Sequence, residues 1–273
     1  MVRIRLVATD LDGTLLDPAG KVADRTVRAV TAARATGIHV IPVTGRPPQG
    51  LWDIAARAGL GPLGVCSNGA ATVDLDRNEI IETQTLARDI AMRLAHAMRT
   101  ASPGIRLAVD VADRFWYETG FFEPPADWDE TVMEVTDITE ILGPDCFKLV
   151  GRNPGVGAVE LIAQLEEHVG EEGHLTTSGL DWVDIGAPGI TKAYAMERVC
   201  DRLGVRVDEV VAVGDNHNDL PLLAWAGTAM APANAIPEAL ALAHRVLPAN
   251  TDHGVATLLE ELTAGRDPTD PAD

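Results

Sequence analysis

The chain has few cysteines and no long apolar run, and each shortage excludes a class of protein. Its 273 residues include only three cysteines, Cys66, Cys146 and Cys200. They are odd in number and isolated in sequence, which excludes a disulfide framework and a cysteine-rich metal site. Each lies in or beside an apolar stretch, so we expect three buried thiols. No apolar run approaches the roughly 20 residues that a membrane-spanning helix needs.

Basic residues are also scarce. Lys and Arg number 22 against 41 Asp and Glu, which gives a net charge of −19. Such a chain repels nucleic-acid backbones and anionic membranes, so we expect it to bind neither. An anionic substrate could still bind beside a metal ion. Residues 1–5 enter a predicted strand without a signal-peptide pattern, so we expect a cytoplasmic protein. For its oligomeric state we expect a monomer or a small homo-oligomer.

The two ends of the chain alternate predicted strands and helices. Hydrophobic residues make up 46% of the sequence, enough for a sizeable buried core. In the first third, strands at 4–9, 38–43 and 64–67 alternate with helices at 23–36 and 49–58. The last third repeats this rhythm with helices at 192–203, 220–226, 237–243 and 254–262 and strands at 210–213, 228–231 and 244–247. This order predicts an α/β fold with a Rossmann-like parallel sheet covered by helices.

The middle of the chain has a different pattern. It contains all four Phe residues and predicts helices at 87–101 and 156–169 among short strands, with a hairpin turn at Ala112-Asp113. The segment 131–142 fits either a helix or a strand. We therefore predict an α+β domain at 84–187, inserted into a discontinuous core of residues 1–83 and 188–273.

Two carboxylates follow the first predicted strand, in the sequence Asp10-Leu11-Asp12-Gly13-Thr14. Like charges this close raise one pKa and favour a bound cation. Asp and Gly also suit an ordinary tight turn, and this stretch alone favours neither interpretation. A calcium loop would need further acidic positions, which the residues after Thr14 do not supply.

Three further predicted strands also end in polar residues. These ends are Thr44-Gly45-Arg46, Asn68-Gly69 and the segment 214–219, which reads Gly-Asp-Asn-His-Asn-Asp. In open parallel sheets, ligands bind beyond the carboxyl ends of the strands, so all four ends should surround one crevice. Turn chemistry alone does not explain four converging polar ends.

These residue types suit phosphoryl transfer. Asp10 can attack phosphorus to give an aspartyl-phosphate, and Asp12 can exchange protons with the leaving alcohol and with water. Asp215, together with Asp10, offers oxygen ligands to Mg²⁺. Thr44 and Lys192 can bind the spare phosphate oxygens. Asn218 and Asp219 can position Lys192, water or the metal shell.

The same motifs, in the same order, resemble those of the haloacid dehalogenase superfamily. The large insertion between the second and third motifs, Ser67-Asn68-Gly69-Ala70 and the final segment 250–256 are similar to its Cof-type, type IIB phosphatases, which carry a type C2B cap. The resemblance covers nearly the whole chain. One departure is Ala193, where the family often has Gly after the motif lysine.

The resemblance implies Mg²⁺-dependent hydrolysis of phosphate monoesters. It implies metal ligation by Asp10, the Asp12 main-chain carbonyl and Asp215, with Asp219 in the outer shell. Thr44 and Lys192 would bind phosphate, and the presence of Asp12 argues against dehalogenase chemistry. For phosphate or substrate binding we further select the strand-end residues and one acid of the inserted domain: Gly45, Arg46, Asn68, Gly69, Asn218 and Asp184.

Three functions follow from these residues. The first is a phosphatase of small phosphorylated metabolites, either sugar phosphates or phosphorylated cofactors. The second is a phosphotransferase or phosphomutase that passes the phosphoryl group to a sugar hydroxyl, which product analysis would reveal. The third is a non-enzymatic sensor of phosphorylated ligands, although a sensor has no need for both Asp10 and Asp12.

Overall fold

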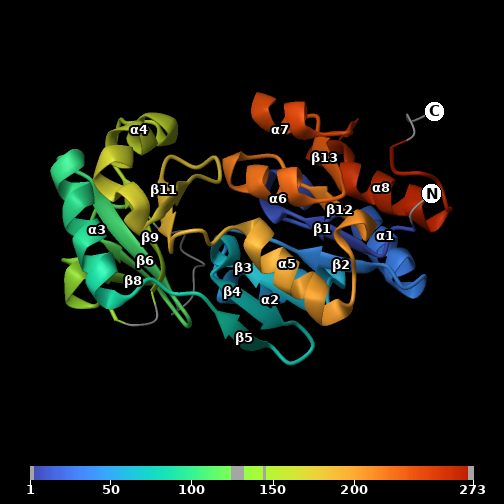
Figure 1. Cartoon of the computed structure of the whole chain (residues 1–273), viewed down its shortest axis with the longest axis horizontal. Helices are drawn as coiled ribbons and strands as arrows, with labels where there is room; N and C mark the ends of the chain where they lie inside the picture. The colour runs from blue at the N-terminus through green and yellow to red at the C-terminus, as the bar shows by residue number, and fades with distance from the viewer. Residues whose placement is uncertain (1–2, 124–131, 144–145, 270–273) are drawn as a thin grey trace.

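The computed structural model describes residues 3–123, 132–143 and 146–269 (Figure 1). One of its sheets has five parallel strands in the order β14-β13-β12-β1-β2. These strands are β1 (Leu6–Thr9), β2 (His39–Pro42), β12 (Val210–Val213), β13 (Thr228–Pro232) and β14 (Arg245–Leu247). Because β1 pairs with both β2 and β12, the two ends of the chain build one parallel sheet, as the sequence predicts.

Helices cover both faces of this sheet because its strands are buried on both sides. In β1, Val7 packs with α1 (Asp24–Ala35), α2 (Trp52–Ala58) and α8 (Gly254–Thr263). Its neighbours Leu6 and Ala8 point to the other face, toward α5 (Lys192–Leu203), α6 (Leu220–Trp225) and α7 (Pro237–Leu242). Side chains alternate along a strand, so a continuous apolar run supplies both cores.

The strand that we predicted at 64–67 as part of the parallel sheet belongs instead to a second sheet of three strands. Within the described residues, strand β3 (Leu63–Cys66) packs beside the parallel sheet and joins its ladder by a single parallel bridge, between Val43 and Val65. It otherwise pairs antiparallel with β4 (Ala71–Asp74), which pairs with β5 (Glu79–Thr83). The hairpin of β4 and β5 was not predicted. Its turn is closed by Asp74, whose Oδ1 accepts the backbone N–H groups of Asp76 and Arg77.

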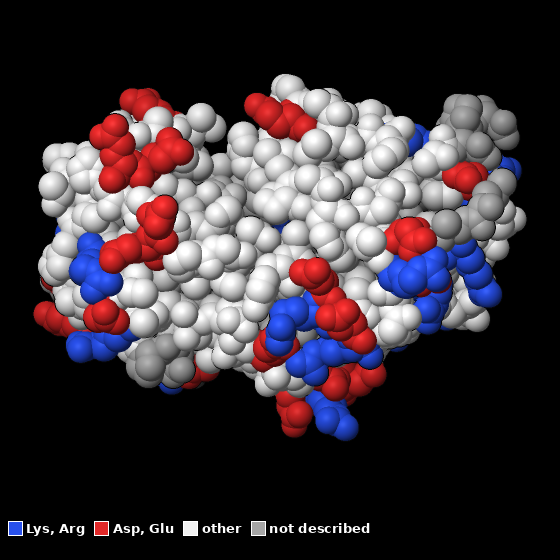
Figure 2. Space-filling model, in the orientation of Figure 1, with Lys and Arg blue, Asp and Glu red and all other residues white. Residues whose placement is uncertain are grey.

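Strand β5 is tied to the core by ion pairs. Glu82 accepts from Arg198 and, at 2.6 Å, from Arg202, both on α5. On the face shown in Figure 2, acidic and basic side chains accordingly lie side by side over α5. Among the described helices, none combines the length and the apolar character that crossing a membrane requires.

The middle of the chain forms a six-stranded sheet, which we call the cap sheet, in the order β10-β11-β9-β6-β7-β8. Its strands are β6 (Arg106–Val111), β7 (Phe115–Glu118), β8 (Val132–Val135), β9 (Cys146–Arg152), β10 (His174–Thr176) and β11 (Val183–Gly186). The α+β pattern is confirmed, and β6 and β7 form the predicted hairpin. The segment 131–142 contains β8 and a short 3-10 turn at Ile138–Glu140, while residue 131 lies outside the described residues.

Helices α3 (Arg88–Ala101) and α4 (Ala158–Val169) pack on one face of the cap sheet, against Leu107, Leu149 and Val183 among others. The opposite face reaches the core, because Lys148 of β9 donates to the main-chain oxygen of Gly45. Figure 1 shows the cap sheet and its helices to the left of the parallel sheet. The domain limits at 84 and 187 stay a prediction.

Candidate active site

The first part of the site is the turn after β1. Asp10 leaves the buried strand, and Gly13 adopts φ +82°, a conformation that favours glycine. A Cβ at Gly13 would run into the Asp215 carboxylate. Thr14, in the same turn, donates to Asp215 Oδ1 at 2.5 Å. The turn therefore brings the first strand's acids against the loop that follows β12.

The second part is the loop after β12, which Asp219 holds in place. Asp219 is fully buried, and its Oδ2 accepts the backbone N–H groups of Asp215 at 2.9 Å and Asn216 at 3.0 Å. Both oxygens of Asp219 are thus engaged, because Oδ1 accepts from Lys192 at 2.6 Å. Asp219 therefore organises the loop, while Asp215 faces the cavity.

Lys192 joins these two loops. It is the first residue of α5, follows the N-cap Thr191, and is completely buried. Its Nζ donates to Asp10 Oδ1 and Asp219 Oδ1, each at 2.6 Å. Gly69, with φ +106°, lies so close to the Thr191 carbonyl that a Cβ could not fit. The glycine thereby lets the start of α5 approach the site.

Burial governs the electrostatics of this cluster. It raises the pKa of Asp10 well above its ordinary value, and Asp219 and Asp215 add to the rise that Lys192 opposes. Burial, reinforced by Asp219, raises the pKa of Asp215 to about 6. Burial alone would lower the pKa of Lys192, but the charges of Asp10 and Asp219 outweigh it and hold that pKa above its ordinary value.

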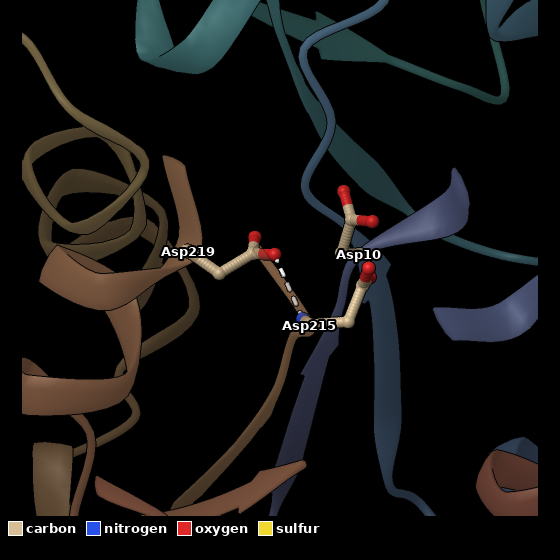
Figure 3. A group of neighbouring side chains, drawn as sticks. All are labelled: Asp10, Asp215 and Asp219. Carbon is tan, nitrogen blue, oxygen red and sulfur yellow. Dashed lines mark hydrogen bonds between the residues drawn. The ribbon is translucent and has the colours of Figure 1, made fainter. Parts of the chain in front are cut away.

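The acids fit a divalent cation. Ligand oxygens of Asp10, Asp215 and Asp219 lie within 4.8 Å of one another. Figure 3 shows the Asp215 carboxylate turned toward Asp10, whereas Asp219 reaches the backbone nitrogen of Asp215. Three carboxylates against the single charge of Lys192 leave an excess of negative charge when all are ionised. Carboxylate oxygens in such a cluster are the ligands that Mg²⁺ prefers.

The loop after β2 contributes a cation and a hydroxyl. Arg46 binds Asp12 through two hydrogen bonds of 2.6 Å, and both side chains are partly exposed. Thr44 is buried, and its Oγ1 accepts the Arg46 backbone N–H at 3.1 Å. This fork orients Asp12, whereas Asp10 is held by its hydrogen bond from Lys192.

A buried polar chain connects the core with the cap sheet. Asn218 donates to Asn68 Oδ1 at 3.0 Å, and Asn68 donates to Asp184 Oδ2 at 2.8 Å. The same Asp184 oxygen accepts from Lys148 Nζ at 3.1 Å, and Lys148 also donates to the Gly45 carbonyl at 2.8 Å. The chain therefore fixes residues from three loops and two cap strands relative to one another.

These parts surround one cavity of about 780 Å³. Seven of the predicted site residues line it: Asp10, Asp12, Thr44, Gly45, Arg46, Asp215 and Asn218. The other five lie close behind, outside the set of described lining residues: Asn68, Gly69, Asp184, Lys192 and Asp219. The predicted strand ends thus converge, and Asp184 meets Lys148 and Asn68 beneath the cavity surface.

Sequence reasoning missed Lys148 and its neighbour Asp110. Lys148 lines the cavity, and Asp110 accepts a 2.5 Å hydrogen bond from Ser67 of the core. The chain has only three lysines, and Lys148 stands within the apolar strand Cys146–Arg152. A lysine in such a strand is costly to bury without a partner, and that signal could have marked it.

Comparisons with known proteins agree with this geometry. A family model described as haloacid dehalogenase-like hydrolase matches residues 7–259. The pyridoxal phosphate phosphatase YbhA of Escherichia coli is 28% identical over 264 residues, covering 93% of this chain and 97% of its own. A haloacid dehalogenase-like hydrolase from B. subtilis superposes with a TM-score of 0.83 at 22% identity, over 95% of this chain and 100% of its own.

The structure of the subclass IIB sugar phosphatase BT4131 superposes with a TM-score of 0.79 at 18% identity. It covers 94% of this chain and 98% of its own, so the cap sheet and the parallel sheet both have counterparts in one solved fold. With the family model spanning both ends of the chain, the motifs, the fold and the named relatives agree. The chain belongs to the haloacid dehalogenase-like hydrolases, and it is a phosphoric-monoester hydrolase.

Proposed function

We propose that this enzyme is a Mg²⁺-dependent phosphatase of small phosphorylated metabolites, either sugar phosphates or phosphorylated cofactors, which reacts through an aspartyl-phosphate on Asp10. The observation that carries the proposal is the position of Asp10. It lines the cavity, accepts from the buried Lys192, and lies within reach of a second acid, Asp215. Relatives named for pyridoxal phosphate and for sugar phosphates support a small substrate.

Asp10, Asp215 and the main-chain carbonyl of Asp12 would hold the Mg²⁺ ion, with Asp219 in the outer shell. Both Asp219 oxygens already accept hydrogen bonds, which supports this outer role. When bound, the ion neutralises charge on the phosphoryl oxygens. The remaining chemistry belongs to the side chains.

In the first step, an Asp10 carboxylate oxygen attacks phosphorus and the bond to the ester oxygen breaks. Asp12 gives its proton to the departing alcohol. In the second step, Asp12 takes a proton from water, and the resulting hydroxide attacks the phosphorus of the aspartyl-phosphate, releasing inorganic phosphate and restoring Asp10. Arg46, which holds Asp12 in a two-bond fork, must release it for these transfers, and the partial exposure of the pair permits this.

Thr44 and Lys192 would bind the non-transferred phosphate oxygens, assisted by Gly45, Arg46 and Asn218 at the cavity wall. The remaining residues act from behind this wall in our proposal: Asn68, Gly69 and Asp184 through the contacts described above. We further propose a cytoplasmic location, a monomer or small homo-oligomer, and no binding to nucleic acid or membranes, which the net charge of −19 supports.

The test is phosphate release from a panel of phosphorylated metabolites, with Mg²⁺ and with chelator, for wild type and Asp10→Asn. We expect release that needs Mg²⁺ and falls by at least about 10³-fold in the variant, because a nucleophile cannot be replaced by an amide. Asp53→Asn, on an exposed carboxylate of α2, is the matched control. Release that survives in Asp10→Asn would refute the mechanism, and an isomerised sugar phosphate without free phosphate would show a mutase.

A further inference from the structure

The cavity has two chemically different walls. The core supplies carboxylates and polar side chains, as described above. The cap sheet and its loops supply an apolar wall made of five side chains: Phe115, Val132, Val150, Leu180 and Trp182. Among the described residues of the cap that line the cavity, the polar side chains are Lys148 and Ser178. Lys148 is already engaged with Asp184 and Gly45.

The register of the cap sheet explains this wall. Phe115 of β7 stands opposite Val132 of β8, and Phe115 is also paired with Asp110 of β6. One end of this face therefore carries the charged residues that meet the core, and the other end carries apolar residues.

The aromatic part of the wall is held rigid from behind. Phe121 is fully buried, and its ring lies 5.7 Å from that of Trp182 at an interplanar angle of 33°. Phe115 meets Phe121 at 6.4 Å and 66°. Packed aromatic rings have few alternative rotamers, so Trp182 and Phe115 present preformed surfaces to the cavity.

We propose that the alcohol part of the substrate carries a planar aromatic or heteroaromatic ring, which packs against Trp182 and Phe115. This inference rests on the proposed phosphatase function and narrows it. A ring gains contact area and stacking against this wall. The hydroxyl groups of a sugar packed against these two rings would lose water without gaining hydrogen-bond partners from the rings, which disfavours polyhydroxylated substrates.

Three esters of primary alcohols with six-membered rings test the wall: benzyl phosphate, cyclohexylmethyl phosphate and glucose 6-phosphate. Their leaving groups are similar in basicity, so differences in kcat/KM report recognition of the ring. We expect benzyl phosphate to exceed glucose 6-phosphate by at least about tenfold, with cyclohexylmethyl phosphate between them. Glucose 6-phosphate equal to or better than benzyl phosphate would overturn the inference.

Substitutions of Trp182 and Phe115 test whether these two rings cause the preference for benzyl phosphate. In Trp182→Leu and in Phe115→Leu, the ratio of kcat/KM for benzyl phosphate to that for glucose 6-phosphate should fall by about fivefold or more. A ratio within one enzyme cancels any general loss of activity. Trp116→Leu is the matched control, because Trp116 neighbours Phe115 on β7 but packs with the helix-covered face of the cap sheet. An unchanged ratio in both test variants contradicts the assignment.

Acetyl phosphate has only a small acetate leaving group, so the cap wall can recognise little of it. It therefore separates a failure of the phosphatase function from a failure of the aromatic-ring inference. If wild type with Mg²⁺ hydrolyses no ester, acetyl phosphate included, the phosphatase function fails. Calorimetric binding of benzylphosphonate and of the phosphonate analogue of glucose 6-phosphate then still decides the inference. Tighter binding of benzylphosphonate, lost in Trp182→Leu, supports the aromatic wall, and equal binding overturns it.

Discussion

Asp110 shows how one buried carboxylate couples the cap sheet to pH. Ser67 donates to its Oδ2, whereas Oδ1 is buried and has no hydrogen-bond partner among the described residues. Burial raises the pKa of Asp110 to about 7, against the opposing effects of Lys148 and Ser67. Near neutral pH the folded protein therefore holds a proton that the unfolded chain has already lost.

We predict that this proton makes the fold less stable as pH rises. Between the ordinary pKa of 3.8 and about 7, the folded state binds more protons at Asp110 than the unfolded state. The free energy of unfolding should consequently fall in that window, by up to about 1.4 kcal/mol per pH unit. Urea unfolding at pH 5 and pH 8 should show a smaller fall in Asp110→Asn than in wild type. Asp113→Asn, on the exposed turn, should keep the wild-type fall, and an equal fall in all three proteins would disprove the assignment.

Gly69 tests whether the start of α5 must approach the site. Ala at this position would be strained at φ +106° and its Cβ would strike the Thr191 carbonyl, next to Lys192. We expect Gly69→Ala to cost about 2–3 kcal/mol of stability and to lower kcat. Gly204→Ala, at φ +62° beyond the other end of α5 with nothing nearby, carries the backbone strain alone. Thermal unfolding and kcat for both variants separate strain from displacement, and equal effects on kcat would refute the displacement.

At the scale of elements, β9 is the strand that reaches across to the core. Its Lys148 is the donor to the Gly45 carbonyl. Lys148→Met keeps the apolar stem and removes the charge, so the loop at 44–50 should open more often. We expect amide exchange there to accelerate about tenfold, as loss of roughly 1.4 kcal/mol implies. Mass-spectrometric hydrogen exchange measures this, with the exposed Lys21→Met as control, and an unchanged rate would show that the contact does not hold the loop.

Elements with strong local signals were predictable from sequence. Helix α5 begins at Lys192 and ends at Leu203, as predicted, because Thr191 caps its start and Gly204 terminates it in the left-handed conformation. The β4–β5 hairpin was missed because β5 is only half buried, so it lacks a marked apolar run. Its partner strand is set by tertiary pairing, which local propensity does not contain.

The same distinction applies to the site. Asp10 and Asp215 could be brought together from sequence, since strand ends of a parallel sheet share one edge. The contact of Lys148 with Asp184 depends on strand register within the cap sheet and on how that sheet docks. Neither the register nor the docking can be deduced from a local sequence motif. The buried position of Asp184, behind the lining of the cavity, likewise needed the structure.

At the scale of the whole molecule, metal binding should contribute to stability. Because Mg²⁺ at about 100 times its dissociation constant adds roughly 2.7 kcal/mol to a protein that binds it only when folded, Tm should rise by several degrees and fall again with chelator. Differential scanning fluorimetry measures the shift. Asp215→Asn removes a cavity-facing carboxylate and should abolish the metal-dependent part of the Tm shift. A shift of equal size in this variant would place the ion elsewhere.

The distribution of lysines has a practical consequence. Of the three lysines in the chain, Lys148 and Lys192 are buried at the site, and Lys21 is exposed on the loop before α1. Amine-reactive dyes and surface linkers should therefore modify the folded enzyme at Lys21, besides any free amino terminus. A fluorophore or a support can be attached there in nearly uniform orientation, while the ammonium groups of Lys148 and Lys192 remain shielded by the fold.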